Sequence, residues 1–310
     1  NEFKKTVDIF AWKKKALIIG FGSIGRKYYG ILKKISEINE IRILTKQKKI
    51  TNKINNFIQA TKFDPDLIIV SSNTSKHLDH LRIIEKNFVN KFVLVEKPLF
   101  DKYYNFKVEK NKIFVGYNLR FDPVIQFLKT KLANKKLWSV NVICNSYLPE
   151  WRGNRDYTKT YSAKRQLGGG VLLDLSHELD YIQWLFGAIK IKFVINNKIS
   201  NLKINTDDNL LLFGKTTNIK QLQMNLNYFS KIPTRNIYID GPKINIVADL
   251  LNKKIIYKEN GNKLIKKWSV NNNHLNYVRQ IKTILQKKKG INSKFYEALK
   301  LMKLINKIKS

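Results

Sequence analysis

The chain has 310 residues, enough for one large domain or two ordinary ones, and 43% of them are hydrophobic. Its 17 Phe, 14 Tyr and 5 Trp can fill real cores, which argues against a disordered chain. No apolar run approaches the roughly 18–20 residues needed to span a bilayer, and the N-terminal stretch lacks the apolar core of a signal peptide. Cys144 is the only cysteine, so no intrachain disulfide can form and we expect a cytoplasmic location.

The formal charge of +36 raises the question of a nucleic-acid or membrane partner. Lysine is spread over the whole chain, however, with only short clusters at 13–15, 46–49 and 287–289. No arginine-rich arm, zinc-finger spacing or aromatic RNA-binding motif accompanies the charge. A compositional bias of the genome therefore explains it better. We expect neither nucleic acid nor membrane as a partner, although the charge should steer anionic substrates.

The first 120 residues alternate short apolar runs with helical patterns, as parallel βαβ units do. Most of the runs are apolar throughout, which is typical of strands buried on both faces. The predicted strands are Ala16–Ile19, Ile41–Leu44, Leu67–Val70, Phe92–Val95 and Ile113–Val115. Apolar residues at helical spacing predict one helix between the first two strands and another around Leu78–Ile84.

The pattern changes after Arg120, where Asp122 and Pro123 are suited to begin a helix. The second half then shows the alternation of strands with one solvated face. Its predicted strands are 138–144, 191–195, 210–213, 222–228, 236–239, 244–247 and 255–258, and helices close the chain at 274–287 and 293–308. We therefore predict an α/β domain over residues 1–120 and an α+β domain with a large, mostly antiparallel sheet over 121–310.

Gly20, Gly22 and Gly25 follow the first apolar run at G-x-G-x-x-G spacing and open a helix. This is the context in which such glycines bind a dinucleotide: a tight turn, close backbone approach to the pyrophosphate, and close helix packing. The backbone at Ser23 and Ile24 would offer its N–H groups at the helix N-terminus. A glycine-rich turn without a ligand is the alternative.

The residues after the second strand bear on which nucleotide binds. An NAD site usually has Asp or Glu there, on the ribose 2′-hydroxyl. This chain has Thr45, Lys46 and further lysines instead. A hydroxyl and ammonium groups suit a 2′-phosphate, so we expect NADP(H) in preference to NAD(H).

Two further motifs carry chemistry. Glu96, Lys97 and Pro98 follow the fourth strand, at the strand end where ligands of such sheets bind, so Lys97 could stabilise a developing alkoxide. The stretch "GGGVLLDLSHELDYIQWLFG" (168–187) predicts a helix with Asp174 and His177 on one face. Such a pair can act as an oriented acid–base couple, although a structural histidine would read the same.

Together these motifs resemble those of the Gfo/Idh/MocA oxidoreductase family. The resemblance runs from about Ala16 to the C-terminus and rests on "GFGSIG", "SSNTSKH", "EKP", "VGYNLRFDP", the glycine–Asp–His stretch and "IDGPKINIVAD". It implies a Rossmann domain with a doubly wound parallel sheet, followed by a C-terminal domain whose open sheet supports a homo-oligomer, dimer or tetramer.

The resemblance also implies site residues. Lys97 and His177 match the family's catalytic lysine and histidine, and Asp174 the partner carboxylate, although many relatives space this Asp and His four apart rather than three. Further matched positions lie near the cofactor (Ser72, Asn73, His77, Glu96) or the substrate (Tyr117, Asn118, Arg120). No metal site is expected, because two histidines (His77, His80) without a third ligand rarely bind one.

The stretch 147–163 is rich in aromatic and basic residues, suited to stack on a sugar and hold an anionic group: Trp151, Arg152, Arg155, Tyr157 and Tyr161. A structured surface loop is the alternative. With the glycine–Asp–His stretch, this segment resembles a subgroup that acts on sugars of bacterial surface polysaccharides.

The expected function is therefore hydride transfer between NAD(P) and a sugar, which could be nucleotide-linked or acidic. One alternative is a family member that uses tightly bound NAD(P) in an internal redox cycle, as in dehydration or epimerisation. The other is a basic nucleic-acid- or membrane-binding protein that keeps the fold without catalysis.

Overall fold

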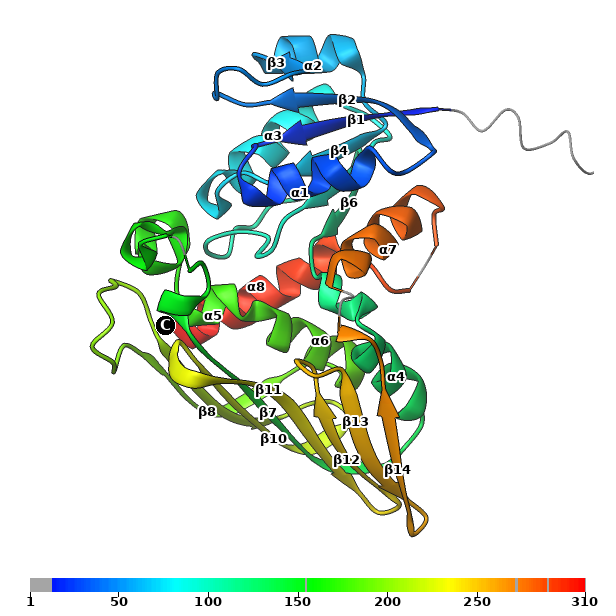
Figure 1. Ribbon diagram of the computed structural model, residues 1–310, viewed down its shortest axis with the longest axis vertical. Helices are drawn as coiled ribbons and strands as arrows, with labels where there is room; N and C mark the ends of the chain where they lie inside the picture. The colour runs from blue at the N-terminus through cyan, green and yellow to red at the C-terminus, as the bar shows by residue number, and fades with distance from the viewer. Residues whose placement is uncertain (1–12, 154, 271–272, 289, 310) are drawn as a thin grey trace, which may run out of the picture. The chain divides into compact units, whose positions relative to one another are not determined.

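The computed structural model describes residues 13–153, 155–270, 273–288 and 290–309 (Figure 1). The N-terminal stretch before residue 13, considered above for a signal peptide, and Lys289 of the last lysine cluster lie outside the described residues. The chain folds into two compact units. Of the described residues, unit 1 comprises those up to Glu96 together with Phe106–Gly116, and unit 2 comprises Lys97–Asn105 together with those from Tyr117 onward.

Unit 1 alternates strands and helices along the chain. Its elements are β1 (Lys14–Ile19), α1 (Ser23–Leu32), β2 (Ile38–Leu44), β3 (Lys53–Ile54), α2 (Phe57–Phe63), β4 (Leu67–Val70), the 3-10 turn η1 (Thr74–Lys76), α3 (His77–Asn87), β5 (Phe92–Val95) and β6 (Lys112–Val115). All pairings among these strands are parallel, in the spatial order β6-β5-β4-β1-β2-β3. This is the strand order of a Rossmann fold.

The core of unit 1 explains why these segments form parallel strands. The four residues of β4 are all buried, and so are Val93, Leu94 and Val95 of β5. Strands that are apolar on both faces require cover on both faces, which the crossover helices of βαβ units supply. The predicted parallel strands are confirmed. The short strand β3 was not foreseen, because a two-residue strand leaves no periodic pattern.

Unit 2 contains a second, larger sheet and several helices. Its strands are β7 (Leu137–Tyr147), β8 (Lys190–Asn197), β9 (Asn209–Lys215), β10 (Ile219–Asn227), β11 (Phe229–Gly241), β12 (Ile244–Asp249), β13 (Lys254–Glu259), β14 (Asn262–Lys267) and β15 (Ser293–Lys294). Its helices are α4 (Pro123–Lys131), α5 (Val171–Asp174), α6 (Ser176–Phe186), α7 (Asn273–Leu285) and α8 (Phe295–Lys309), with 3-10 turns at Asn118–Phe121 and between residues 148 and 167.

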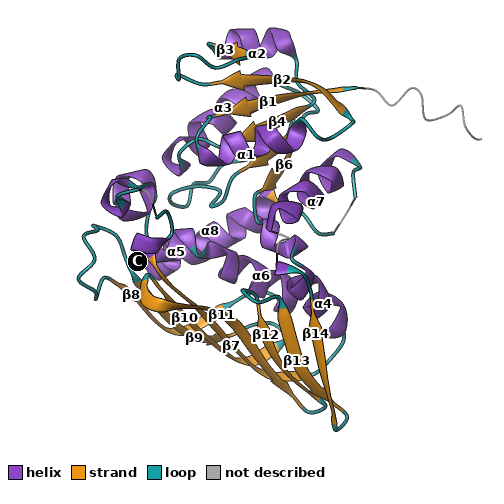
Figure 2. Ribbon diagram, viewed as in Figure 1, coloured by secondary structure: helices purple, strands orange, loops and turns teal. Residues whose placement is uncertain are grey.

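The eight-stranded sheet of unit 2 has the order β14-β13-β12-β11-β7-β10-β9-β8. Its pairings are antiparallel except for β7 with β10, as predicted for a mostly antiparallel sheet. Helices α5, α6 and α8 lie over one face (Figures 1 and 2). Alternate residues such as Val142, Met224 and Ile237 are buried, whereas Phe193 and Phe213 are exposed.

Two neighbouring residues, Asp122 and Pro123, determine where helix α4 of unit 2 begins. The side chain of Asp122 accepts a hydrogen bond from the N–H of Val124 at 3.0 Å, and Pro123 is the first residue of α4, as predicted.

Two expectations about secondary structure were wrong. The strand predicted to end at Tyr228 ends at Asn227, and the single helix predicted across Asp174 and His177 is broken at Leu175. The exposed strand β14 was missed because its lysines obscure any alternation. Among the described residues, no helix combines the length and apolarity needed to cross a membrane.

Candidate functional site: a glycine turn and a buried lysine–tyrosine–aspartate cluster

The glycine turn of unit 1 joins β1 to α1, and two of its glycines are required by the protein itself. Gly20 has a φ of +90°, and a Cβ there would lie 2.7 Å from the backbone nitrogen of Ser72. A Cβ on Gly25 would lie 2.3 Å from the carbonyl oxygen of Gly20. The turn therefore packs tightly against the end of β4, where Ser71 Oγ donates to the Gly20 carbonyl at 2.9 Å.

Gly22 is different, because the fold does not require it. Its φ of −76° is accessible to any residue, and a Cβ there would meet no atom within 4 Å. This residue is the N-cap of α1 and has no side chain to bond the first N–H groups of the helix. The open space beside a helix N-terminus is what a pyrophosphate needs. The residues present thus fit a dinucleotide.

The end of β2 is tied to the glycine turn by a residue that the sequence reasoning did not single out. Gln47 donates from Nε2 to the carbonyl of Phe21 at 2.9 Å and accepts from Arg26 at 2.9 Å. The Arg26 guanidinium also lies over the Phe21 ring at 4.6 Å. Thr45 accepts from the N–H of Gln47 at 3.2 Å, while Lys46 is exposed. Arg26 could have been noticed as the residue directly after the third glycine.

The segment after β4 brings several of the predicted cofactor residues to the same edge of the sheet. The His77 ring contacts the Ser72 carbonyl at 3.1 Å, and the Ser72 hydroxyl contacts His80 Nδ1 at 2.9 Å. Burial, then the neighbouring His77, lowers the pKa of His80 to about 4. Asn73 is exposed. These contacts hold the loop beside the glycine turn. Asn73 is the N-cap of η1, but its side chain makes no capping hydrogen bond.

Glu96 directly follows β5 in unit 1. Its Oε1 accepts a hydrogen bond from Tyr28 of α1 at 2.5 Å. Gly116, after the neighbouring β6, leaves room for this carboxylate: a Cβ there would lie 3.0 Å from Glu96 Oε1. Glu96 therefore links α1 to two strand ends.

Lys97, the next residue, belongs to unit 2 and contacts the helix pair that follows the three glycines. Its Nζ donates to the backbone carbonyl of Asp174 at 2.6 Å. That carbonyl is available because α5 ends at Asp174, so the regular helical bond that would use it is interrupted. The break at Leu175 thus creates an acceptor for the lysine.

The Asp174 carboxylate is held by tyrosines rather than by the histidine. Tyr228, directly after β10, donates its hydroxyl to Asp174 Oδ2 at 2.6 Å in a buried setting. The hydroxyl of Tyr161 lies against the same carboxylate. Burial and this carboxylate raise the pKa of both tyrosines well above their ordinary value, so both hydroxyls stay protonated.

The oriented Asp174–His177 couple expected from sequence is therefore not formed in the structure. The two residues lie on different helices, and no described residue hydrogen-bonds to His177 Nδ1, which is buried. The His177 ring instead packs edge-on against Tyr117, with centroids 5.6 Å apart. The physical reason is the helix break at Leu175, because α5 ends at Asp174 and α6 begins at Ser176.

His177 is surrounded by positive charge. Desolvation, then the charges of Lys97 and Arg235, lowers the pKa of this imidazole well below its ordinary value. Arg235 of β11 is ion-paired with the fully buried Glu178 at 2.6 Å. The cluster thus keeps His177 neutral, which is the form that accepts a proton.

Tyrosine and arginine residues of the stretch 147–163 gather beside this cluster. Trp151 packs edge-on against Tyr228 at 5.1 Å between ring centroids, and Arg152 lies over the Tyr161 ring at 5.6 Å. Trp151, Arg152 and Arg155 line one small hollow. Trp151, Arg152 and Arg155 thus lie together, and Tyr161 lies beside Arg152; that they bind a substrate stays a prediction.

Arg120 has a different setting from the ligand-facing one expected. Its guanidinium donates twice to Asp180, at 2.7 and 2.8 Å, and once to Glu297 at 2.8 Å. The side chain is buried, and its pKa is raised because these two carboxylates outweigh burial. Arg120 therefore ties the 3-10 turn η2 (Asn118–Phe121) to α6 and α8. Asn118 is also buried. The Tyr117 hydroxyl donates a hydrogen bond to Ser176 Oγ at 3.4 Å.

The sequence matches the description "Oxidoreductase family, C-terminal alpha/beta domain" over residues 129–297, more than half of the chain. A curated relative, the uncharacterized oxidoreductase sll0816 of Synechocystis sp., is 26% identical over 132 residues, or 40% of this chain. The match spans 36% of that relative's length.

Solved structures share the fold over nearly the whole chain. The WlbA dehydrogenase from Bordetella pertussis, solved with NADH and UDP-GlcNAcA, has a TM-score of 0.74 and 14% identity, covering 96% of this chain and 95% of its own. A levoglucosan dehydrogenase solved with NADH has a TM-score of 0.78 and 11% identity, covering 95% of both chains. With the matched domain, the Rossmann sheet and the open second sheet in place, the chain belongs to the Gfo/Idh/MocA family of oxidoreductases.

Proposed function

We propose that this protein transfers a hydride between a nicotinamide cofactor and a sugar or sugar derivative. The observation that carries the proposal is a lysine ammonium that is fixed on the Asp174 carbonyl and whose charge helps to keep His177 neutral in unit 2. When bound, the nicotinamide supplies the hydride acceptor or donor. The glycine turn of unit 1, with its open space at Gly22, would hold its pyrophosphate.

Lys97 and His177 divide the remaining chemistry of alcohol oxidation. As the C–H bond of the carbinol gives up its hydride, the hydroxyl proton passes to the neutral His177. Lys97 uses one of its three N–H groups on Asp174 and can direct the others at the developing oxyanion. In the reductive direction the same groups act in reverse, with the imidazolium returning the proton to the alkoxide.

Asp174 acts in this scheme by holding Lys97 rather than by orienting His177. Its carbonyl binds the ammonium, while its carboxylate is fixed by Tyr228 and faces Tyr161. Because Tyr228 restrains the side chain, the carbonyl on the same residue has less freedom. A precisely placed ammonium is what oxyanion stabilisation requires.

A sugar substrate is supported by the residues beside the cluster. The exposed Trp151 offers a flat face, and Arg152 and Arg155 offer charge for an anionic group. The WlbA relative binds a nucleotide-linked sugar acid, and the chain's charge of +36 favours an anionic substrate. We therefore place acidic or nucleotide-linked sugars first among candidate substrates.

The preference for NADP(H) rests on the end of β2. No carboxylate stands at residues 45–49, where the 2′-hydroxyl of NAD would need one. Arg26, held over Phe21 by Gln47, and Lys46 offer two positive groups for a 2′-phosphate. We expect the wild type to bind NADPH more tightly than NADH. Arg26→Ala and Lys46→Ala should each lose this preference, whereas the control Lys86→Ala, a substitution on α3, should keep it. Equal affinities for both nucleotides would contradict the preference.

The activity test uses spectroscopy of bound NAD(P)H with a panel of free, acidic and nucleotide-linked sugars. Net, stoichiometric conversion of the cofactor with one sugar supports the proposal. Sugar turnover without net change in the cofactor would favour the internal redox cycle instead. Dinucleotide binding in Lys97→Ala, with no conversion, locates the defect in chemistry.

We further propose a cytoplasmic homo-oligomer that pairs the open face of the unit 2 sheet. Three apolar side chains on or near that face are exposed: Phe193 by 55%, Phe213 by 42% and Val247 by 38%. Association would remove this apolar surface from water. Light scattering should give a dimer or tetramer, and Phe213→Lys should shift it toward monomer.

A further inference from the structure

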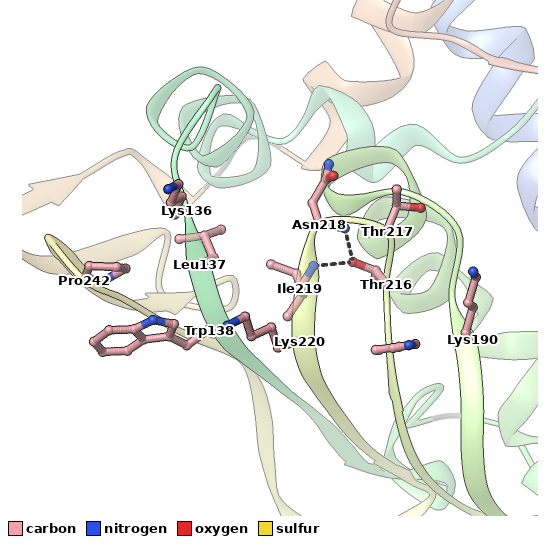
Figure 3. Close-up of a pocket in the computed structure, with 11 residues that line it drawn as sticks. Lys136, Leu137, Trp138, Lys190, Thr216, Thr217, Asn218, Ile219, Lys220 and Pro242 are labelled. Carbon is pink, nitrogen blue, oxygen red and sulfur yellow. Dashed lines mark hydrogen bonds between the residues drawn. The ribbon is translucent and has the colours of Figure 1, made fainter.

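A hollow at one end of the unit 2 sheet is not used by the proposed reaction. It has a volume of about 520 Å³ and is formed where β7, β9 and β10 begin or end and β11 turns into β12. This volume is within the range of small-molecule sites. Figure 3 shows Trp138 and Pro242 on one side and Lys190 on the other.

Four lysines and no carboxylate line this hollow: Lys136, Lys190, Lys215 and Lys220. Among the described residues, none of these four ammonium groups has an acidic partner within 4 Å, since no ion pair includes them. Nearby Lys131 and Lys135, by contrast, are both paired with Glu259, at 2.5 and 2.8 Å. Unpaired like charges around one hollow repel each other, and an anion would relieve that repulsion.

Trp138 adds an aromatic surface to the lysines. It is 51% exposed, although its neighbour Leu137 is buried. An indole left half in water beside cations can stack on a flat, anionic ligand. Thr217 and Asn218 are exposed and add polar groups, and the turn that presents them is fixed: Thr216 Oγ1 accepts from the N–H groups of Asn218 and Ile219, at 3.2 and 3.1 Å (Figure 3).

The basic lining continues beyond this hollow. A second hollow of about 240 Å³ shares Lys136 and Pro242 with the first and adds Lys135 and Lys243. The ligand therefore has room for more than one phosphate along the sheet end. Lysine abundance hid this feature in the sequence, because only the fold brings residues 136, 190, 215 and 220 together.

We propose that this hollow binds a nucleotide, with the base stacked on Trp138 and the phosphates among the four lysines. The source is either a free nucleoside phosphate or one unit of a single strand, and both share this chemistry. The site lies within unit 2 and is separate in the sequence from the glycine turn, so it does not depend on the proposed function.

The test measures binding of uridine triphosphate, a ten-nucleotide oligouridylate and inorganic tripolyphosphate, each in the background of Gly22→Leu, whose added side chain fills the open space at the glycine turn. Expected are an affinity for UTP that weakens with salt and a roughly 5- to 100-fold loss in Trp138→Leu. The double variant Lys190→Gln, Lys220→Gln should lose binding of all three probes. Tripolyphosphate should be insensitive to Trp138→Leu, because it has no base.

The control is Lys267→Gln with Lys300→Gln, two exposed lysines outside the hollow. Equal losses in control and hollow variants, or UTP binding unchanged by Trp138→Leu, would overturn the proposal; matching thermal unfolding of all variants shows that each is folded. Oligouridylate binding that is tenfold tighter than UTP and weakened by Lys243→Gln would identify a single strand. Similar affinities would identify the free nucleotide.

Discussion

The glycine turn of unit 1 and the lysine cluster of unit 2 are built in opposite ways. Gly20, Gly22 and Gly25 lie within six residues, and the contacts that explain them are local or reach only the neighbouring strand. Lys97, Tyr161, Asp174 and Tyr228 span more than 130 residues and meet only in the fold. A site built from neighbouring residues can be recognised in the sequence as a motif. A site built from distant residues appears there only as isolated residues without a recognisable pattern.

The largest expected effect tests the distant cluster. Lys97→Ala removes the ammonium that faces the oxyanion, so turnover should fall by about 10²–10³-fold or more. Dinucleotide affinity should change little, because the glycine turn is intact. Steady-state kinetics with calorimetry on the same samples measures both, and Lys91→Ala, paired with Asp64 in unit 1, is the matched lysine control. Undiminished turnover in Lys97→Ala would contradict the mechanism.

Removing the tyrosine that holds Asp174 should have the next largest effect. Tyr228→Phe deletes the 2.6 Å hydrogen bond to Oδ2 and leaves the ring against Trp151. Loss of this bond frees Asp174 and so misplaces Lys97; because a misplacement of about 1 Å can cost roughly 100-fold in rate, kcat should fall by up to about 100-fold with little change in cofactor affinity. A kcat near the wild-type value in Tyr228→Phe would show that this hydrogen bond does not position Lys97. Tyr238→Phe, on the same sheet, is the control.

The contrast explains how far the sequence could lead. The parallel strands, the N-cap of α4 and the glycine turn follow from apolar runs, Asp122–Pro123 and glycine spacing, all of which act over a few residues. The partner of Asp174 could not be derived, because the helix breaks at Leu175 and Tyr228 approaches from β10. The ion pairs of Arg120 could not be derived either, because its carboxylate partners, Asp180 and Glu297, lie far along the chain.

The glycines themselves should respond unequally. Gly25→Ala would place a Cβ 2.3 Å from the Gly20 carbonyl, and overpacking of this kind costs about 1–3 kcal/mol, or roughly 2–10 °C in Tm. Gly22→Ala meets open space, so its Tm should stay near that of the wild type while dinucleotide affinity falls. Calorimetric unfolding and ligand titration of the two variants separate these effects. A large loss of Tm in Gly22→Ala would show that the fold, not a ligand, requires this glycine.

The smallest effect concerns protonation in the cluster. The pKa of His177 is lowered by desolvation and by Lys97 and Arg235, so its imidazole should stay neutral as pH falls from 7 through its ordinary value. In Lys97→Met one positive charge is gone, and the pKa should rise toward the ordinary value. NMR titration of the histidine rings, assigned with His177→Asn, follows this. A titration near pH 6.5 in the wild type would mean that the cluster does not shield His177.

The division between a binding unit and a reacting unit is tested most directly by calorimetric titration of NADPH into three proteins: wild type, Gly22→Leu and Lys97→Ala. A leucine at residue 22 would fill the space left open beside the N-terminus of α1. The account predicts that Gly22→Leu loses binding while Lys97→Ala binds as the wild type does. Binding that survives in Gly22→Leu, or that disappears in Lys97→Ala alone, would contradict it.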